Sequence, residues 1–221
     1  MITVHHLNNS RSQRVLWLLE ELELSYEIKH YQRDPQTMLA PPELRRIHPL
    51  GKSPVITDGE LTLAESGAIL EYLVARYGAG RFRPAPGTPE ALRYVYWMHF
   101  AEGTAMPPLL MKLVFDRIEH KSPLLVRPIA GAIARKAKAM IVTPSLQRHL
   151  DFMEAELGNR PWFAGDEFSA ADIQMSFPVE ASAVRAGLDA SRPRLLDFLQ
   201  RIHARPAYAR ALQRGGPFAL A

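Results

Sequence analysis

Glu65 and Ser66 have the residue types and the position to hold a charged small molecule, because a predicted strand ends and a predicted helix begins there. The unpaired N–H groups and partial positive charge of a helix N-terminus attract a carboxylate or a phosphate. Glu65, one residue earlier, is placed to hold a cation beside that anion. A carboxylate and an ammonium on one carbon make an amino acid. The pair is therefore predicted to hold one end of a small zwitterion, and an ordinary helix N-cap is the alternative.

A hairpin and a helix position this pair. Val55-Ile56 leads into the hairpin, and Leu61 and Leu63 alternate on the way out, which is the period of a strand. Asp58-Gly59 lies between the two strands and is typical of a two-residue type I′ turn. The helix that follows runs to about Tyr77.

The first part of the chain predicts a βαβ unit. Ile2–Leu7 and Tyr26–Tyr31 have strand character and flank an amphipathic helix over about 12–24. A short helix is expected around 42–47. Together with the hairpin and its helix, the order is βαβαββα over residues 1–78. Ser10-Arg-Ser-Gln13 also fits a capping box at the start of the first helix.

The rest of the chain is predicted to be helical. Residues 79–89 are rich in Gly and Pro and are expected to be a linker. Residues 90–221 have helical periodicity, with long helices over about 90–115 and 124–157. The Met106-Pro-Pro108 step must kink or break the first of these. The predicted fold class is a small α/β domain followed by an all-α domain.

Composition excludes several functional classes. A net charge of +4 over 221 residues is too small to indicate nucleic-acid binding. No apolar run reaches the ~18 residues that a membrane span needs. Met1 leads directly into a predicted strand, which leaves no room for a signal peptide, and a cytoplasmic protein is expected.

The counts of Cys and His limit the chemistry further. The chain has no cysteine, which excludes disulfides, thiolate metal sites and a Cys-x-x-Cys redox centre. Its eight histidines show no metal-ligand spacing, so no metal is expected. Any thiol chemistry must use a thiol brought by a ligand.

Three motifs, in order along the chain, resemble the cytosolic glutathione transferases. The start, Val4-His-His-Leu7 with Ser10-Arg-Ser-Gln-Arg14 and Leu16-Trp-Leu-Leu-Glu-Glu-Leu22, is similar to bacterial and fungal members. Pro49-Leu-Gly-Lys52, Ser53-Pro54-Val55 and Glu65-Ser66-Gly-Ala-Ile-Leu-Glu-Tyr-Leu73 resemble the family's glutathione-binding half. Phe168-Ser-Ala-Ala-Asp172 resembles its helix-capping signature. The resemblance implies that the first domain is thioredoxin-like and that the second borders the electrophile site.

The resemblance implies that Ser10 is the catalytic residue. Its hydroxyl would donate a hydrogen bond to the glutathione sulfur and favour the thiolate. Lowering the thiol pKa by roughly two units requires only ~2.7 kcal/mol. Asn9 is the nearest rival donor and Ser12 the next, and a capping role for Ser10 alone is the competing interpretation.

The resemblance also implies the other glutathione contacts. Pro54 is expected to be cis, so that the backbone of Ser53 pairs with the cysteinyl backbone of glutathione. Lys52 would face the glycyl carboxylate, or would simply be solvated. Ser66 and Glu65 would hold the γ-glutamyl end. His99 and Glu102 are candidates to reach the active site, but their roles are left open. Tyr94, Trp97, Met98, Met106 and Met111 either border the electrophile or pack in the core.

The expected function is a homodimeric, cytoplasmic glutathione transferase acting in detoxification, with glutathione as co-substrate and a small hydrophobic electrophile. The alternatives are a glutathione-dependent peroxidase or disulfide reductase, and a non-catalytic glutathione-fold binding module. Fold alone does not choose among them.

Overall fold

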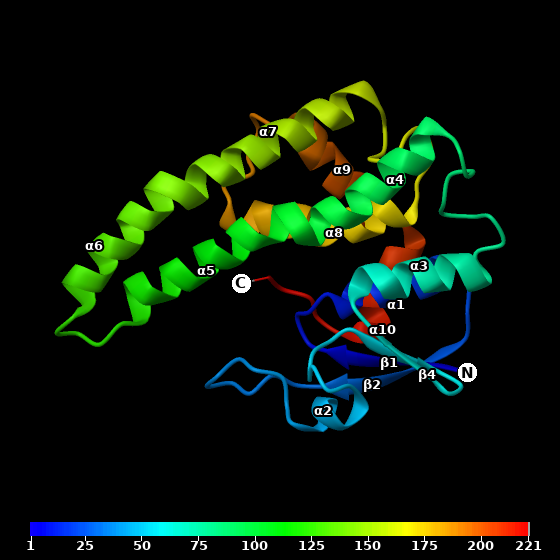
Figure 1. Ribbon diagram of the computed structural model, residues 1–221, viewed down its shortest axis with the longest axis horizontal. Coiled ribbons are helices and arrows are strands. Elements are labelled where there is room, and N and C mark those ends of the chain that lie inside the picture. Colours follow the sequence, from blue (N-terminus) through cyan, green and yellow to red (C-terminus); the bar gives the residue numbers. More distant parts are fainter. Residues whose placement is uncertain (221) are drawn as a thin grey trace.

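The computed structural model describes residues 1–220 and has two parts, a sheet with its helices and a larger set of helices (Figure 1). The predicted βαβαββα order of the first part is confirmed. Its elements are β1 (Ile2–Leu7), α1 (Ser12–Glu21), β2 (Tyr26–Tyr31), α2 (Glu43–Ile47), β3 (Val55–Asp58), β4 (Leu61–Ala64) and α3 (Ser66–Tyr77).

The four strands form one mixed sheet in the order β2-β1-β3-β4. β1 pairs parallel with β2 and antiparallel with β3, which places the end of β1 beside the segment that enters β3. The loop after β1 and the loop before β3 therefore meet at one edge of the sheet.

The predicted type I′ turn is wrong in position and type. Asp58 pairs with Leu61, so the two turn residues are Gly59 and Glu60. Of these only Gly59 has a positive φ, +60°. A type I′ turn needs positive φ at both residues, whereas glycine at the first position with a positive φ fits type II′.

The second part is helical, as predicted, but its two long helices contain interruptions. Each interruption is a single π-helical turn, η1 or η2, from which the helix continues, and Pro107 and Pro108 stand in the first turn of α5, where a proline is tolerated. The elements are α4 (Pro89–Phe100), η1 (Ala101–Ala105), α5 (Met106–Lys121), α6 (Arg127–Ala137), η2 (Lys138–Val142), α7 (Thr143–Asn159), α8 (Ala170–Arg185), α9 (Pro193–His203) and α10 (Pro206–Gly215).

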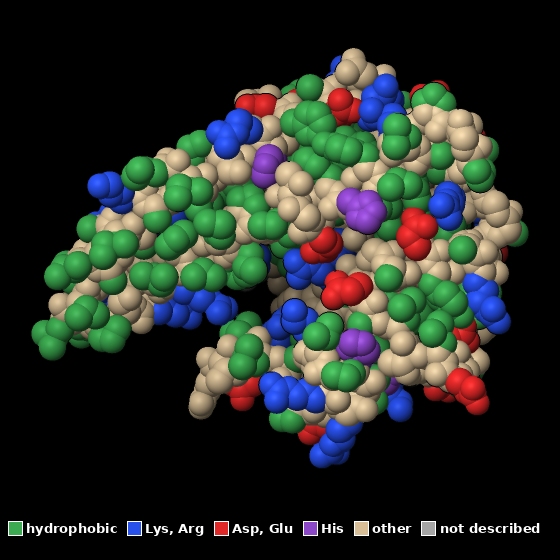
Figure 2. Space-filling model, in the orientation of Figure 1, with side chains coloured by type: hydrophobic (Ala, Val, Ile, Leu, Met, Phe, Trp, Pro, Cys, Tyr) green, Lys and Arg blue, Asp and Glu red, His purple; other side chains and the backbone are tan. Residues whose placement is uncertain are grey.

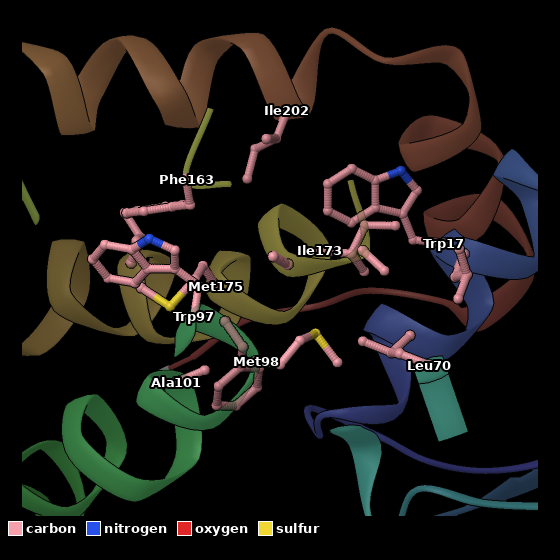
Figure 3. Packing of buried hydrophobic residues seen from close by; sticks show 14 of the residues in the cluster. Trp17, Leu70, Trp97, Met98, Ala101, Phe163, Ile173, Met175 and Ile202 are labelled. Carbon is pink, nitrogen blue, oxygen red and sulfur yellow. The ribbon is translucent and has the colours of Figure 1, made fainter. Parts of the chain in front are cut away.

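One buried apolar cluster joins the two parts. In Figure 3, Trp17 of α1 and Leu70 of α3 face Ile173 of α8, and Trp97 of α4 packs near Phe163. The last helix, α10, returns to pack against α1. Because the sheet-bearing part shares its core with α8 and α10, side chains from distant segments are held in fixed positions around the edge of the sheet.

The start of α8 is held by the predicted capping box, which is confirmed. Ser169 accepts a hydrogen bond from the Ala171 N–H, and the Asp172 carboxylate accepts one from the Ser169 N–H at 2.9 Å. Burial raises the pKa of Asp172 to about 6 even though it accepts these bonds. Within the described residues, no helix is long and apolar enough to cross a membrane.

Candidate active site

Ser10 lies in the loop between β1 and α1, where its side chain is 4 % exposed. Its Oγ lies 2.7 Å from the Ser12 Oγ, 3.5 Å from the Ser53 Oγ, and accepts the Ser12 backbone N–H at 3.2 Å. The N-cap of α1 is Arg11 and makes no side-chain capping bond, so the capping box from Ser10 to Gln13 is absent. The Ser10 oxygen still accepts the first N–H of α1, but that contact leaves the hydroxyl proton free.

A chain of neutral hydrogen bonds runs inward from Ser10. The Ser12 Oγ lies 2.8 Å from the His6 Nδ1. The His6 ring is also hydrogen-bonded to the backbone of Gly215, a contact that favours the protonated ring and so identifies the carbonyl as acceptor. With the proton on the nitrogen that faces Gly215, Nδ1 accepts from Ser12. Burial, with a contribution from His30, lowers the pKa of His6 to about 4, so the ring is neutral near pH 7.

The direction of each hydroxyl follows from this tautomer of His6. Because Ser12 gives its proton to His6, Ser10 is the donor in the Ser10–Ser12 contact. The Ser12 N–H holds the Ser10 oxygen in place. A rotation about one bond turns the Ser10 proton away from Ser12 and toward a ligand.

Ser53 and Pro54 form the neighbouring loop, and the peptide bond between them is cis, as expected. The Ser53 hydroxyl donates to the His5 carbonyl at 2.9 Å and accepts the Leu7 N–H at 3.2 Å. These contacts attach the loop to β1. Among residues 1–220 the backbone N–H and C=O of Ser53 have no backbone partner, so they are free to pair with an extended ligand.

Ser66 begins α3 and is 3 % exposed. Its Oγ accepts a hydrogen bond from the Arg14 Nη2 at 2.8 Å. Since the arginine can only donate, the Ser66 hydroxyl proton remains available together with its N–H. Both donors are at the helix N-terminus, which favours an anion.

Arg14 is the charged centre of this end of the site. Its side chain is 1 % exposed, and its guanidinium contacts the Ser66 Oγ, the Gln174 carbonyl at 2.7 Å and the Glu102 carboxylate at 2.5 Å. Burial lowers the pKa of Arg14, and the Glu102 charge opposes this. Although burial would raise it, Arg14 and Arg11 together hold the pKa of Glu102 below its usual value.

Glu102 reaches this position from the π turn η1. Its carboxylate also accepts from the Arg11 Nε at 2.9 Å and 3.0 Å, so one acid joins two arginines. A π turn inserts an extra residue into a helix and is frequent at functional sites. Here the π turn places the Glu102 side chain, which belongs to the helical part, next to the first turns of α1 and α3.

Glu65 adopts a strained backbone conformation beside this group. Its φ of +70° is uncommon for a residue with a Cβ, and such outliers are concentrated at ligand sites. Glu65 and Glu102 line a pocket of about 530 Å³ between α3, α4, η1 and α8. Gln174 also lines this pocket, and its side-chain oxygen is buried without a hydrogen-bond partner among residues 1–220. Two carboxylates at one pocket suit an ammonium ion.

Three further candidate residues, Asn9, Ser12 and Lys52, have other surroundings than Ser10, Ser53 and Ser66. Asn9 uses its side-chain oxygen to accept the Ala219 N–H at 2.9 Å. Ser12 is fully buried behind Ser10. Lys52 is exposed and has no ion pair among the described residues. Ser12 is therefore poorly placed to reach a sulfur, and the roles of Asn9 and Lys52 remain predictions.

The aromatic and methionine side chains of α4 and α5 differ in burial. Tyr94, Trp97, Met98 and Met106 are buried in the core, whereas Met111 is 38 % exposed. Core packing is therefore the role of Tyr94, Trp97 and Met106, whereas Met98 also lines the 530 Å³ pocket.

Sequence reasoning missed Arg14 as a site residue and assigned no role to Glu102. A signal for Arg14 existed, because it precedes Leu18 by one helical turn on the apolar stripe of α1, and a buried arginine needs a partner. Nothing in the sequence connects it with Glu102, which is 88 residues away.

Comparison with known proteins agrees with this geometry. The glutathione S-transferase N-terminal domain model matches residues 1–75, and the C-terminal domain model matches residues 108–206. Glutathione S-transferase 3 of Schizosaccharomyces pombe is 40 % identical over 183 residues, which cover 82 % of this chain and 74 % of the relative. Glutathione S-transferase 1 of Saccharomyces cerevisiae is 32 % identical over 218 residues, covering 95 % and 93 %.

Among solved structures, a glutathione S-transferase from Actinobacillus pleuropneumoniae superposes with a TM-score of 0.83 at 34 % identity. The match covers 100 % of this chain and 95 % of that one. The two domain models together span most of the chain, and the relatives match it nearly end to end. The chain therefore belongs to the glutathione transferase family.

Proposed function

We propose that the protein binds glutathione along the edge of its sheet and transfers the thiolate to a small hydrophobic electrophile. The observation that carries this proposal is the 3.5 Å separation of the Ser10 and Ser53 hydroxyl oxygens. A cysteinyl backbone paired with Ser53 would bring its sulfur next to Ser10. Because the chain has no cysteine, the thiol must come from this ligand.

The γ-glutamyl end is assigned to Ser66 and its surroundings. The α-carboxylate would accept from the Ser66 N–H and hydroxyl at the N-terminus of α3, close to the Arg14 charge. The ammonium would enter the pocket lined by Glu65, Glu102 and Gln174. Hydrogen bonds to charged groups are worth about 1.5–3 kcal/mol each, enough to anchor a tripeptide by one end. Lys52 would meet the glycyl carboxylate at the other end.

The chemistry required of the protein is modest. Ser10 donates one hydrogen bond to the sulfur, which stabilises the thiolate relative to the thiol. The thiolate is the nucleophile, and the protein holds it in reach of the second substrate. No protein group needs to form a covalent bond.

The proposal includes a cytoplasmic homodimer with a role in detoxification. Leu92, Val95 and Tyr96 of α4 are 73 %, 42 % and 47 % exposed, an apolar surface next to α3 that a second copy would cover. Sedimentation equilibrium at micromolar concentration tests the dimer. A species near the monomer mass of 24.9 kDa would contradict it.

Two measurements test the catalytic proposal. Isothermal titration should show glutathione binding, and the absence of binding at millimolar glutathione would refute the proposal. An assay panel should then show turnover of an aryl halide. Turnover of only a hydroperoxide or a mixed disulfide would indicate a glutathione-dependent reductase, and turnover of none would indicate a binding module.

A further inference from the structure

The residues that follow α10 return to the loop that carries Ser10. Helix α10 ends at Gly215, and residues 216–220, called here the returning segment, run on from it (Figure 1). In the same orientation, the space-filling view shows a notch between the arm formed by α5 and α6 and the sheet-bearing part (Figure 2). The returning segment runs toward the inner end of this notch, where the two parts of the molecule meet.

Gly216 sets the course of the returning segment. Its φ of +88° and ψ of −175° lie in a region that is essentially restricted to glycine. Pro217 follows, and a proline cannot continue a helix. Helix α10 therefore stops at Gly215, and the chain turns away from its axis.

Two apolar side chains anchor the returning segment. Leu220 is 7 % exposed and belongs to the buried core, and Phe218 packs against that core with its ring 6.0 Å from the ring of Phe177 on α8. Leu220 also borders a hollow of about 440 Å³ together with Leu199 of α9. Because apolar burial holds Phe218 and Leu220, the backbone of Ala219 between them is held as well.

Ala219 in turn holds Asn9, the residue before Ser10. The Ala219 N–H donates to the Asn9 Oδ1 at 2.9 Å. Asn9 has a φ of +49°, which is uncommon for residues with a Cβ and which asparagine adopts more often than most. Its carbonyl accepts from the Arg33 Nη2 at the longer distance of 3.5 Å. The backbone that leads into Ser10 is therefore tied to a residue 210 positions away in the sequence.

A second contact reaches Ser10 from the other side. The Gly215 backbone is hydrogen-bonded to the His6 ring, which lies 2.8 Å from the Ser12 Oγ, and Ser12 contacts Ser10 at 2.7 Å. The chain from the end of α10 onward thus holds the surroundings of Ser10 at two points, through His6 and through Asn9. These two contacts come from one continuous stretch of the chain.

We propose that Asn9 is a positioning residue, and that the returning segment, by holding the Asn9 side chain, keeps Ser10 in place to donate to the glutathione sulfur. This inference rests on the proposed role of Ser10. Asn9 acts through the backbone of Ser10 and does not touch the sulfur. A loop that is held in this way spends less time in conformations that cannot donate, and the stabilisation of the thiolate scales with the competent fraction.

The two partners of the Asn9–Ala219 hydrogen bond can be changed separately. Asn9→Gly removes the acceptor and still permits the positive φ, whereas Ala219→Pro removes the N–H and leaves the Asn9 side chain intact. Each variant should raise the pKa of the bound glutathione thiol toward ~8.5. Each should also lower kcat/KM for an aryl halide roughly fivefold, the change expected for one net hydrogen bond. The double variant should be no worse than either single variant, because both remove the same contact.

These variants distinguish positioning from direct contact with the sulfur. If the Asn9 amide itself donates to the sulfur, Asn9→Gly raises the thiol pKa and Ala219→Pro leaves it unchanged, which overturns the inference. Effects that add in the double variant also overturn it, because additive effects belong to independent sites. An unchanged thiol pKa in both single variants does so too.

The anchor of the returning segment offers a matched pair of variants. Leu220→Ala loosens the segment without changing Asn9 or Ala219, and Leu199→Ala removes a leucine from the same hollow but from α9. Both should lower the melting temperature, because each deletes buried apolar atoms. Only Leu220→Ala should raise the thiol pKa. A rise in both variants would assign the effect to a general loss of stability and contradict the inference.

Amide hydrogen exchange keeps this inference testable apart from the proposed function. If bound glutathione shows no lowered thiol pKa in wild type, the proposed role of Ser10 fails. The Ser12 N–H, which the Ser10 Oγ accepts at 3.2 Å, still reports the position of Ser10. It should exchange faster in Ala219→Pro and Leu220→Ala than in wild type and Leu199→Ala. Equal exchange in all four proteins would show that the returning segment does not position Ser10.

Discussion

The two ends of the candidate glutathione site hold their polar groups in different ways. At the sulfur end, Ser10, Ser12 and His6 form a chain of neutral hydrogen bonds. At the γ-glutamyl end, Arg14 and Glu102 form a largely buried ion pair that also reaches Ser66. Both ends lie on the same sheet edge and share helix α1.

The difference corresponds to what each end has to recognise. The γ-glutamyl group is charged before and after the reaction, so fixed opposite charges suit it. The sulfur changes from thiol to thiolate, and a neutral donor stabilises the anion without binding it so strongly that attack is suppressed. The two ends should therefore respond differently to substitution, pH and ligand changes.

The largest effect is expected at the ionic end. Arg14→Met removes a fully buried cation and leaves the Glu102 carboxylate and the Ser66 hydroxyl without their partner. The free energy of unfolding, measured by urea denaturation, should fall by about 3 kcal/mol. The double variant Arg14→Met, Glu102→Leu should recover part of the loss. A loss below about 1 kcal/mol would show that the ion pair is not structural.

A pH effect of similar size is expected at the neutral end. The pKa of His6 is about 4 in the folded protein and ~6.5 in the unfolded chain. The unfolded chain therefore binds more protons between these values, and stability falls as pH falls from about 6.5 to 4. The contribution reaches ~3 kcal/mol at the lower limit.

His6→Asn is the matched comparison for this prediction, because an asparagine oxygen can accept from Ser12 in place of Nδ1 and does not titrate in this range. Urea denaturation of both proteins at several pH values gives the difference between them. If the difference in unfolding free energy between wild type and His6→Asn does not change with pH, His6 is not buried in its neutral form.

A smaller effect is expected from Glu65→Gln, which keeps the shape of the side chain and removes its charge. Glutathione affinity by isothermal titration should fall by roughly tenfold, ~1.4 kcal/mol. Wild type should discriminate strongly against a glutathione analogue that lacks the γ-glutamyl amine, and the variant should discriminate little. Equal discrimination by both proteins would assign the ammonium to Glu102 and Gln174 alone.

The order of elements in the first domain and the helical character of the second could be predicted from sequence, because periodicity and turn residues are local signals. Ser66 could be singled out for the same reason, because it stands at the start of a helix, whereas Ser10 and Ser53 were proposed from the resemblance to the family's motifs. The π turn at Ala101–Ala105 was not, because an inserted residue leaves the helical pattern almost unchanged.

The ion pair of Arg14 and Glu102 depends on packing between distant segments. Its arginine lies on the buried face of α1, and its acid comes from a different domain. The capping box predicted from Ser10 to Gln13 is absent for a similar reason. The Ser10 hydroxyl is directed by Ser12 and by His6, whose ring is in turn held by the Gly215 backbone near the other end of the chain.

The central claim is that the Ser10 hydroxyl stabilises the thiolate of bound glutathione. Thiolate absorbance of the glutathione complex, measured against pH, tests it most directly in wild type, Ser10→Ala and Ser12→Ala. The bound thiol should have a pKa well below ~8.5 in wild type. It should rise toward that value in Ser10→Ala, with glutathione affinity little changed. Ser12→Ala should keep the low pKa, because it retains the N–H that holds Ser10 and removes only a competing acceptor. An unchanged titration in Ser10→Ala would contradict the claim.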